Sequence, residues 1–500
     1  MRIVMIGCGY VGLVSGACFA EFGHDVTCVD IDAGKIDALR AGVIPIYEPG
    51  LDVLVTRHVN TGNLHFVADL AAAVPEADVV FIAVGTPSRR GDGQADLTYV
   101  YAATRQIAGA LRGFTVVVTK STVPLGTGDE VERIIREENP GADVAVVSNP
   151  EFLREGSAIA DLRNPDRIVI GLSDERARGV MTEVYHSLAE KQVPLLFTSR
   201  RAAELIKYAA NAFLAVKITF INEMADLCEK AGADVEEISR GIGLDRRIGG
   251  KFLQAGPGFG GSCFPKDTLA LVKTAQDFGR PLRLVETTVA VNDQRKRGMA
   301  RKVVAACGGS VRRRTIAVLG LTFKPETDDM RGAPSLDIIR ALQDQGAIIR
   351  AFDPAGMEVA KTLLEDVNYA ATPYEAAEGA DCLVIVTEWD QFRNLDFDYL
   401  KVTMAAPVLV DLRNIYQPHE IASHGFHLTG IGRSADKAAV TGRDMPSILA
   451  ASLRSIVNLL PGPLTFDNER SPISRIVPSP KLRGSGRLRT SRISGSALAE

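Results

Sequence analysis

The segment RIVMIGCGYVGLVSGACFAEFG (residues 2–23) decides the fold of this chain. Residues 2–6 form an apolar run of strand length. They lead into GCGYVG (7–12), a glycine-rich turn that opens an apolar helical stretch. A second apolar run, residues 26–29, ends on Asp30. The order of these elements predicts the first βαβ unit of a dinucleotide-binding sheet: a strand, a glycine turn, a buried helix and a second strand that ends on an acidic residue.

Each residue type in this unit has a physical role in binding a dinucleotide. Gly7 permits the turn, Gly9 lets the backbone approach the pyrophosphate, and Gly12 allows close packing of the helix. The start of the helix offers free N–H groups to the phosphates. Asp30 would accept hydrogen bonds from a ribose and repel a 2′-phosphate, which favours NAD over NADP. The alternatives are another nucleotide in the same kind of domain and, for Lys35, a cofactor contact or a solvated helix charge.

Strands and helices alternate in two separate parts of the chain. The strand-like runs after the first unit are 79–84, 115–120 and 144–149, and those of the second part are 315–321, 348–354, 382–387 and 408–414. Such alternation predicts parallel sheets that are covered by helices on both faces. Between the two parts, residues 201–232 have helical periodicity and contain no strand candidate.

We therefore expect an α/β protein with two Rossmann-like, doubly wound parallel-sheet domains joined by a helical central domain. The NAD-binding domain would occupy residues 1–195, the helical central domain 196–305 and the second Rossmann-like domain 306–434. Residues 435–500, which are basic and rich in Ser, Pro, Gly and Arg, are expected to be a disordered tail.

The composition indicates a globular cytoplasmic protein. A chain of 500 residues with 46% apolar residues is too long for one core. The 7 cysteines are scattered and form no CxxC pair, and no histidines cluster at metal-ligand spacing, so we expect free thiols and no metal site. The sequence shows neither the pattern of a signal peptide nor an apolar stretch of roughly 20 residues, so we expect no contact with a membrane. The net charge of -4 argues against a general nucleic-acid binder.

The segment GPGFGGSCFPKD (256–267) indicates covalent chemistry. Four glycines in the six residues 256–261 weaken both helix and strand, so this backbone is shaped around a ligand. Pro265 suits the first turn of a helix, which would place Cys263 at the positive helix end, where a thiolate is favoured. A single cysteine is ordinarily a small buried hydrophobe. The glycine-rich approach, the helix start, and Lys266 and Asp267 favour a nucleophile instead.

Other polar residues stand where a doubly wound fold places its ligands. Lys207 and Asn211 are spaced i, i+4 and share one face of the predicted central helix. They are either an oxyanion clamp or a snorkelling lysine beside a capping amide. The segments GTP (85–87), KSTVP (120–124) and NPEFLREG (149–156) follow predicted strands of the first sheet. The alternative for each is an ordinary turn.

Seven motifs together resemble the UDP-glucose/GDP-mannose dehydrogenase family over about residues 1–433. They are GCGYVG (7–12), GTP (85–87), KSTVP (120–124), NPEFLREGSA (149–158), ELIKYAANAFLAVKITFINE (204–223), FLQAGPGFGGSCFPKD (252–267) and GLTFKPETDDMR (320–331). The resemblance implies a four-electron oxidation of UDP-glucose to UDP-glucuronate with two NAD and water, through a thiohemiacetal and a thioester, for polysaccharide biosynthesis. Around the cysteine the chain is similar to UDP-glucose enzymes rather than to those for GDP-mannose or UDP-N-acetylmannosamine.

The resemblance also implies the role of individual residues. Cys263 would be the nucleophile, Lys207 and Asn211 would stabilise the oxyanion, and Asp267 and Thr122 would position or activate water. The implied UDP-sugar contacts are Glu151, Phe152, Leu153, Arg154, Glu155, Lys207, Asn211, Phe252, Leu253, Gln254, Ala255, Gly256, Gly260 and Lys324. The implied NAD contacts are Gly7, Gly9, Val11, Gly12, Asp30, Lys35, Thr86, Thr122, Glu155, Lys266 and Arg331. The chain departs from the family at Gly332-Ala333, where a Glu-Ser pair often follows the arginine.

The second sheet is expected to bind the UDP moiety. Its turn, residues 320–324, reads GLTFK and lacks a GxGxxG pattern. The apolar helices of the central domain would pair two copies into a homodimer. Two other functions are compatible with parts of the sequence. The first is a two-electron hydroxyacid dehydrogenase, which needs neither Cys263 nor a third domain. The second is a non-catalytic UDP-sugar-binding regulator, which would not require the intact set of catalytic residues.

Overall fold

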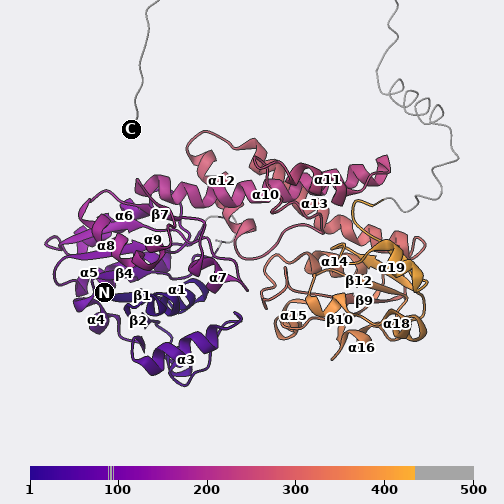
Figure 1. The fold of residues 1–500 in the computed structure, drawn as a ribbon, viewed down its shortest axis with the longest axis horizontal. Helices are drawn as coiled ribbons and strands as arrows, with labels where there is room; N and C mark the ends of the chain where they lie inside the picture. Colours follow the sequence, from indigo (N-terminus) through magenta and orange to yellow (C-terminus); the bar gives the residue numbers. More distant parts are fainter. Residues whose placement is uncertain (88, 90–92, 94, 434–500) are drawn as a thin grey trace, which may run out of the picture. The chain divides into compact units, whose positions relative to one another are not determined.

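Two sheets organise the part of the chain that the computed structural model describes, which is residues 1–87, 89, 93 and 95–433 (Figure 1). The first sheet, indigo to purple, has the strand order β3-β2-β1-β4-β5-β6-β7-β8. The second sheet, orange, has the order β11-β10-β9-β12-β13-β14. In both orders the chain starts in the middle of the sheet, winds to one edge and then returns to the other side. The expected doubly wound α/β class is confirmed.

The first sheet is built from eight short strands. Its strands are β1 (Arg2–Ile6), β2 (Asp25–Val29), β3 (Leu64–Val67), β4 (Val79–Ile82), β5 (Thr115–Thr119), β6 (Val144–Ser148), β7 (Ile168–Gly171) and β8 (Leu195–Thr198). Its helices are α1 (Tyr10–Glu21), α2 (Ala33–Arg40), α3 (Leu51–Thr61), α4 (Leu70–Ala73), the 3-10 helix η1 (Val74–Glu76), α5 (Thr98–Ala110), α6 (Thr127–Glu138), α7 (Ala158–Arg163), α8 (Arg176–Val184) and α9 (His186–Glu190). One junction departs from the predicted parallel sheet, because β6 and β7 pair antiparallel at Ser148 and Gly171.

The central segment is helical, as predicted. Its helices are α10 (Arg200–Ala231), α11 (Val235–Gly243), α12 (Phe264–Asp277) and α13 (Arg283–Ala306). The side chain of Ser199 accepts a hydrogen bond from the N–H of Ala202 and caps the start of α10. Gly232, with φ of 75°, ends the helix in the left-handed conformation. Helix α10 packs against β6, β7, α12 and α13.

The second sheet follows with shorter elements. Its strands are β9 (Thr315–Leu319), β10 (Ile348–Phe352), β11 (Val367–Tyr369), β12 (Cys382–Ile385), β13 (Val408–Asp411) and β14 (His427–Thr429). Its helices are α14 (Pro334–Gln343), α15 (Met357–Leu363), α16 (Pro373–Ala377), α17 (Asp390–Arg393), α18 (Phe397–Thr403) and α19 (Pro418–Ser423). The strand pairs of this sheet are all parallel.

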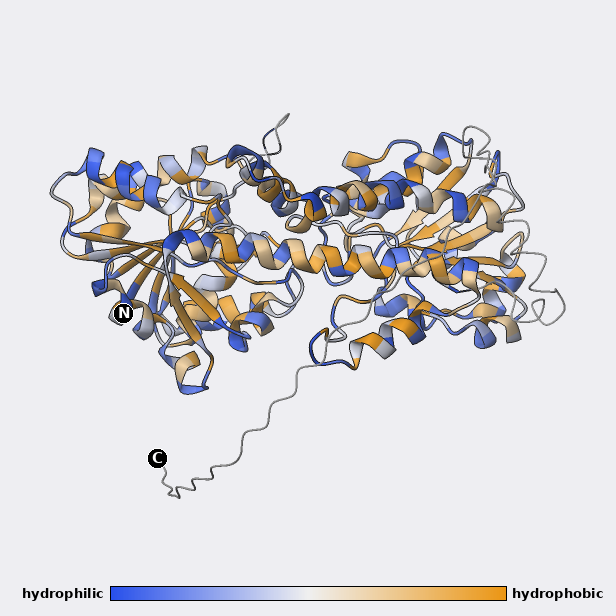
Figure 2. Cartoon of the chain, turned by 90° about the horizontal axis from the view of Figure 1, so that it is seen from above, coloured by the Kyte–Doolittle hydropathy of each residue, from blue (hydrophilic) through white to orange (hydrophobic). Residues whose placement is uncertain are grey.

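The buried cores follow the two-residue period of the strands. In β1, Ile3 and Met5 belong to one core cluster, while Val4 and Ile6 belong to another. Alternating side chains therefore pack on opposite faces of the sheet, and Figure 2 shows the strands as predominantly hydrophobic. Ile221 of α10 shares a core cluster with β9. The central helices and the second sheet thus share one core. A shared core does not mark a boundary between them, so the predicted domain boundaries stay predictions.

Three further predictions concern a membrane span, a metal site and the tail. Among the described residues, no helix has the length and apolar character needed to span a bilayer. The described part of the chain also contains no group of three or more His, Cys, Asp or Glu side chains suited to a metal ion. The predicted tail, residues 435–500, lies outside the described residues.

We predict that Gly12→Ala lowers the thermal stability of the protein, whereas Gly9→Ala does not. A Cβ atom on Gly12 would overlap the carbonyl oxygen of Gly7, while a Cβ atom on Gly9 would meet no atom within 4 Å. Overpacking of this kind costs about 1–3 kcal/mol. Thermal unfolding followed by circular dichroism checks the difference, and equal melting temperatures for the two variants would contradict it.

Candidate functional site

A cavity of about 900 Å³ opens where β1, β2 and β4 end. Gly7, Gly9, Asp30 and Lys35 line it, together with residues of α5. The structure thus brings these four predicted cofactor residues together at the carboxyl ends of the central strands, where doubly wound sheets bind ligands. Gly7 has φ of 103°, a conformation that favours glycine.

The carboxylate of Asp30 is held by three donors. It accepts hydrogen bonds from the N–H of Cys8 at 2.8 Å, the N–H of Asp32 at 3.1 Å and Nζ of Lys35 at 2.9 Å. Burial acts to raise the pKa of Asp30, but these donors outweigh it and hold the pKa below its ordinary value. Lys35 is therefore not a purely solvated charge, because it pairs with Asp30 at the edge of the cavity.

The other predicted cofactor residues lie outside this cavity. Gly12 packs behind Gly7, Val11 packs against the core, and Thr86 donates its hydroxyl to the carbonyl of Thr122 at 3.0 Å. Four predicted contacts remain. Thr122 accepts the hydrogen bond from Thr86, and Glu155 lines the second cavity described next. Arg331 pairs with Glu155, and Lys266 pairs with Asp267.

A second cavity of about 380 Å³ contains most of the predicted substrate and catalytic residues. The predicted residues that line it are Glu151, Phe152, Leu153, Arg154, Glu155, Lys207, Asn211, Phe252, Gly260, Cys263 and Lys324. They come from the loop after β6, from α10, from the glycine-rich loop before α12 and from the loop after β9. Residues more than one hundred positions apart thus surround one space of the size of a small-ligand site.

Cys263 caps α12 and faces this cavity. Pro265 lies in the first turn of the helix, as the sequence predicts. The expected stabilised thiolate needs correction. Burial raises the pKa of the Cys263 thiol, and the nearby carboxylates of Glu151 and Asp267 add to this, although the ammonium of Lys207 opposes it. The burial of Cys263 therefore opposes the effect of the helix start on the pKa of the thiol.

Lys207 and Asn211 lie one turn apart on α10, and both are buried. Nζ of Lys207 is 3.0 Å from Oε1 of Glu151. Nδ2 of Asn211 donates to Oδ2 of Asp267 at 2.7 Å. Both side chains therefore have defined partners inside the protein, so Lys207 is not a snorkelling lysine. Two donors on one helix face beside Cys263 form an arrangement suited to an oxyanion.

Asp267 is completely buried and does not line the cavity. Its carboxylate holds the amide of Asn211 and lies 2.9 Å from Nζ of Lys266. The hydroxyl of Thr122 donates to Oε1 of Glu151 at 3.4 Å. Asp267 thus contacts Asn211 directly, and Thr122 contacts Glu151, the partner of Lys207.

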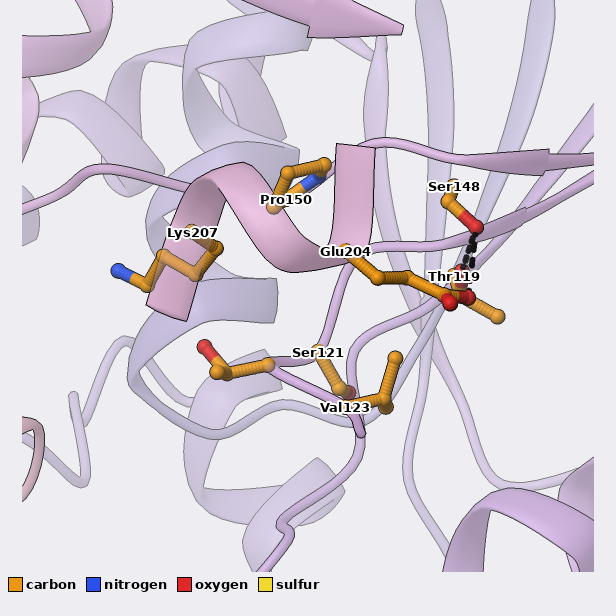
Figure 3. A pocket seen from close by; sticks show the side chains of 8 residues that line it. Thr119, Ser121, Val123, Ser148, Pro150, Glu204 and Lys207 are labelled. Atoms are coloured by element: carbon orange, nitrogen blue, oxygen red, sulfur yellow. Dashed lines mark hydrogen bonds between the residues drawn. The ribbon is translucent and has the colours of Figure 1, made fainter. Parts of the chain in front are cut away.

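Glu204 anchors the segment that carries Thr122. Figure 3 shows Glu204 and Lys207 on the same stretch of α10, with the Glu204 carboxylate directed toward Ser148 and Thr119. This carboxylate also accepts hydrogen bonds from the N–H groups of Gly126 and Gly128, at 2.6 and 2.7 Å, at the start of α6. A carboxylate at a helix N-terminus is stabilising. The sequence contained no local sign of this contact.

The loop after β6 supplies charged and aromatic groups to the cavity. Burial acts to raise the pKa of Glu151, but Lys207 and the N–H of Leu153 hold it below its ordinary value. The guanidinium of Arg167 stacks 3.7 Å from the ring centroid of Phe152. Arg154 pairs with Asp161, at 2.6 Å.

Glu155 joins this loop to the second half of the chain. Its Oε1 accepts from the Ser262 hydroxyl at 2.8 Å and lies 3.2 Å from Arg331, and its carbonyl accepts from Lys324. Burial and the carboxylate of Asp329 raise the pKa of Glu155 to about 7.

Four predicted substrate residues do not line the cavity. They are Leu253, Gln254, Ala255 and Gly256. Leu253 is part of the hydrophobic core. The backbone of Gly256 is held by Asn222 and Arg295, at 2.8 and 2.7 Å. Of this run only Phe252, with φ of 65°, reaches the cavity.

The second sheet has an acidic strand tip of its own, Asp353, but its carboxylate is used internally. Oδ2 accepts from the N–H of Leu321 at 2.6 Å and from Nε1 of Trp389 at 3.2 Å. Oδ1 accepts from the N–H of Gly356 at 2.7 Å. These donors hold the Asp353 carboxylate inside the second sheet, and the UDP moiety stays the predicted ligand of this sheet.

We predict that Lys207→Met destabilises the protein by about 3–5 kcal/mol, because it leaves Glu151 buried without its ion-pair partner. The double variant Lys207→Met/Glu151→Gln should be more stable than the single variant, since no unpaired charge remains. Urea unfolding of the two variants measures the difference. A double variant as unstable as Lys207→Met would contradict this view of the pair.

Three models of one family match successive parts of the chain. The models of the UDP-glucose/GDP-mannose dehydrogenase family match residues 1–189 (NAD binding domain), 201–294 (central domain) and 317–418 (UDP binding domain).

Individual relatives extend this match. A UDP-glucose 6-dehydrogenase of Rhizobium meliloti (strain 1021) is 69% identical over 435 residues, which cover 87% of this chain and 100% of that protein. A solved UDP-glucose dehydrogenase of the archaeon Pyrobaculum islandicum has a TM-score of 0.78 and 40% identity, covering 84% of this chain and 95% of that one. A UDP-D-ManNAc dehydrogenase of Pyrococcus horikoshii has a TM-score of 0.77 and 27% identity, covering 87% and 100%. The fold is therefore similar to enzymes for two different sugars, whereas the sequence is more similar to those for UDP-glucose.

Proposed function

The chain belongs to the UDP-glucose/GDP-mannose dehydrogenase family, and we propose that it acts as a UDP-glucose 6-dehydrogenase. In this reaction UDP-glucose, two NAD and water give UDP-glucuronate. The identity of 69% to a UDP-glucose 6-dehydrogenase supports the substrate. The observation that carries the chemistry is that Cys263, Lys207 and Asn211 line one cavity.

The first cavity fits NAD. Gly9 leaves space for a close approach of the pyrophosphate, and Asp30 presents an ionised carboxylate for the ribose. Bound NAD would accept a hydride from C6 of the sugar in each oxidation. We propose Gly7, Gly9, Val11, Gly12, Asp30, Lys35, Thr86, Thr122, Glu155, Lys266 and Arg331 as its contacts.

Cys263 retains the sugar between the two oxidations. In the mechanism we propose, its sulfur adds to the C6 aldehyde, and the thiol proton goes to the carbonyl oxygen, which gives a thiohemiacetal. Loss of a hydride from C6 and of the proton from that oxygen leaves a thioester. Water then adds to the thioester carbon, the C–S bond breaks, and the carboxylate and the thiol are released.

Lys207 and Asn211 act where negative charge develops on the oxygen at C6. Each donor of such a clamp contributes about 3 kcal/mol to the stabilisation of a tetrahedral oxyanion. Asp267 holds the Asn211 amide by accepting a hydrogen bond from its Nδ2, and we propose Asp267 and Thr122 as the residues that position water. Glu151 to Glu155, Phe252, Gly260 and Lys324 would bind the UDP-sugar.

We propose a homodimer formed through α10. Phe213, Phe220 and Leu227 are spaced by seven residues along this helix and are 64%, 48% and 56% exposed. An apolar stripe of this kind favours helix pairing. Phe220→Asp should shift the molar mass in light scattering toward the monomer, with Phe278→Asp, at an exposed position directly after α12, as the matched control. An unchanged mass for Phe220→Asp would contradict the proposed interface.

A cytoplasmic location is the remaining part of the proposal. All seven cysteines lie within the described residues and are free thiols. Persistent free thiols are typical of a reducing compartment.

The function is tested by counting NADH formed per mole of sugar with UDP-glucose, GDP-mannose and UDP-N-acetylmannosamine. We expect two NADH per UDP-glucose and much slower reaction with the other two sugars. One NADH per sugar would indicate a two-electron dehydrogenase, and no NADH with any sugar would indicate a non-catalytic binding protein.

We predict that Cys263→Ser reduces turnover at least about 100-fold, because an alkoxide leaves an acyl intermediate less readily than a thiolate. Steady-state NADH formation measures the loss. Intact-protein mass spectrometry should detect sugar retained as an ester. Near-normal turnover of the serine variant would contradict the covalent mechanism and would favour oxidation through a hydrated aldehyde.

A further inference from the structure

Lys120, the first residue after β5, is a buried cation that the mechanism above does not use. Its side chain is only 3% exposed, and it lines the cavity of Cys263. Nζ donates to Oδ1 of Asn149 at 3.1 Å and to the hydroxyl of Tyr185 at 3.2 Å. Within the described residues, no carboxylate lies at ion-pair distance from this ammonium. A buried cation held by neutral acceptors is costly, which points to a use.

The partners of Lys120 are held rigidly. The Tyr185 hydroxyl donates to Oδ1 of Asn149 at 2.5 Å, so its oxygen is free to accept from Lys120. Nδ2 of Asn149 donates to the carbonyl of Val169 in β7 at 2.8 Å. Asn149 and Tyr185 are completely buried. The ammonium is thus fixed at the boundary between the sheet and the cavity.

Charges of alternating sign extend from Lys120 across the cavity wall. The charged groups that act on Lys120 are Glu151, in the loop after β6, and Lys207 of α10. Glu151 pairs with Lys207, and beyond Lys207 the carboxylate of Asp267 pairs with Lys266. This group has three cations and two carboxylates, and its net charge is therefore +1. The cations are Lys120, Lys207 and Lys266, and the carboxylates are Glu151 and Asp267.

This excess charge matters for Lys207. Glu151, at 3.0 Å, neutralises Lys207 and would also repel an oxyanion forming beside it. In a buried site such interactions are weakly screened. Lys120 lines the same cavity and interacts with Glu151 through its charge, beyond ion-pair distance. This second cation offsets the repulsion by Glu151 and leaves the attraction of Lys207 for an oxyanion in place.

We propose that Lys120 is a positioning residue of this reaction, whose ammonium balances Glu151 so that Lys207 remains available to the oxyanion at C6. Lys120 acts through Glu151 and does not contact the reacting atoms. The inference rests on the function proposed above.

The ammonium of Lys120 titrates within an accessible pH range. Burial lowers the pKa of Lys120 to about 8, an effect that Glu151 opposes and Lys207 strengthens. The charged form is therefore present below about pH 8 and is lost as the pH rises through this value. Turnover should fall in the same range.

The experiment measures kcat for NADH formation from UDP-glucose between about pH 6 and pH 10. In Lys120→Met, kcat below pH 8 should drop at least about tenfold, and the fall above pH 8 should disappear. Lys120→Arg should keep most of the activity, and its fall should move to higher pH, because a guanidinium does not lose its proton in this range. The KM for UDP-glucose should change little in either variant.

Tyr185→Phe is the matched variant, because it removes one acceptor without removing a charge. The ammonium then loses a stabilising hydrogen bond, so the fall in kcat should move to lower pH. This variant also tests the proposal if Lys120→Met does not fold. Lys120→Met with wild-type kcat, or an unchanged fall near pH 8 in Lys120→Met or in Tyr185→Phe, would overturn the role of Lys120. A wild-type enzyme that forms no NADH from UDP-glucose would instead overturn the proposed function.

Discussion

The buried ion pair between Lys207 and Glu151 is the interaction on which the candidate site depends. Its 3.0 Å contact joins α10 to the loop after β6, and therefore joins the central helices to the first sheet. The pair holds the ammonium near Cys263 and keeps the pKa of the buried Glu151 carboxylate below its ordinary value. Such a pair adds little net stability compared with apolar packing. In the proposed reaction, its value lies in holding a charge beside the reacting centre.

The backbone around this pair is organised by contacts that only glycine permits. Gly260 packs against the carbonyl of Gly332, and the N–H of Gly261 donates to the carbonyl of Arg331 at 2.7 Å. The glycine-rich loop is thereby fixed against the segment after β9, so that Cys263 begins α12 next to Lys207. The departure from the family at Gly332 lies in this contact. A side chain on Gly260 would separate the two segments.

Local sequence patterns predicted the features that depend on neighbouring residues. The strand, glycine turn and helix of residues 2–23, the helix of residues 201–232, and the position of Cys263 at a helix start all follow from periodicity and from the conformational limits of Gly and Pro. The strands β3, β7, β8, β11 and β14 were not predicted from the sequence. The antiparallel junction of β6 and β7 depends on their pairing, which no local pattern encodes.

The sequence by itself thus determined the fold class, the glycine turn after β1 and the position of Cys263 at a helix start, because each is encoded within a short stretch of chain. Only the tertiary structure decided which side chains surround Cys263. Asn211 meets Asp267 across 56 residues, Lys120 meets Tyr185 across 65, and Leu253 turns into the core although its neighbour Phe252 reaches the cavity. The raised pKa of Cys263 likewise follows from burial among these groups. Such contacts arise from the packing of distant elements, and the electrostatics of a site depends on them.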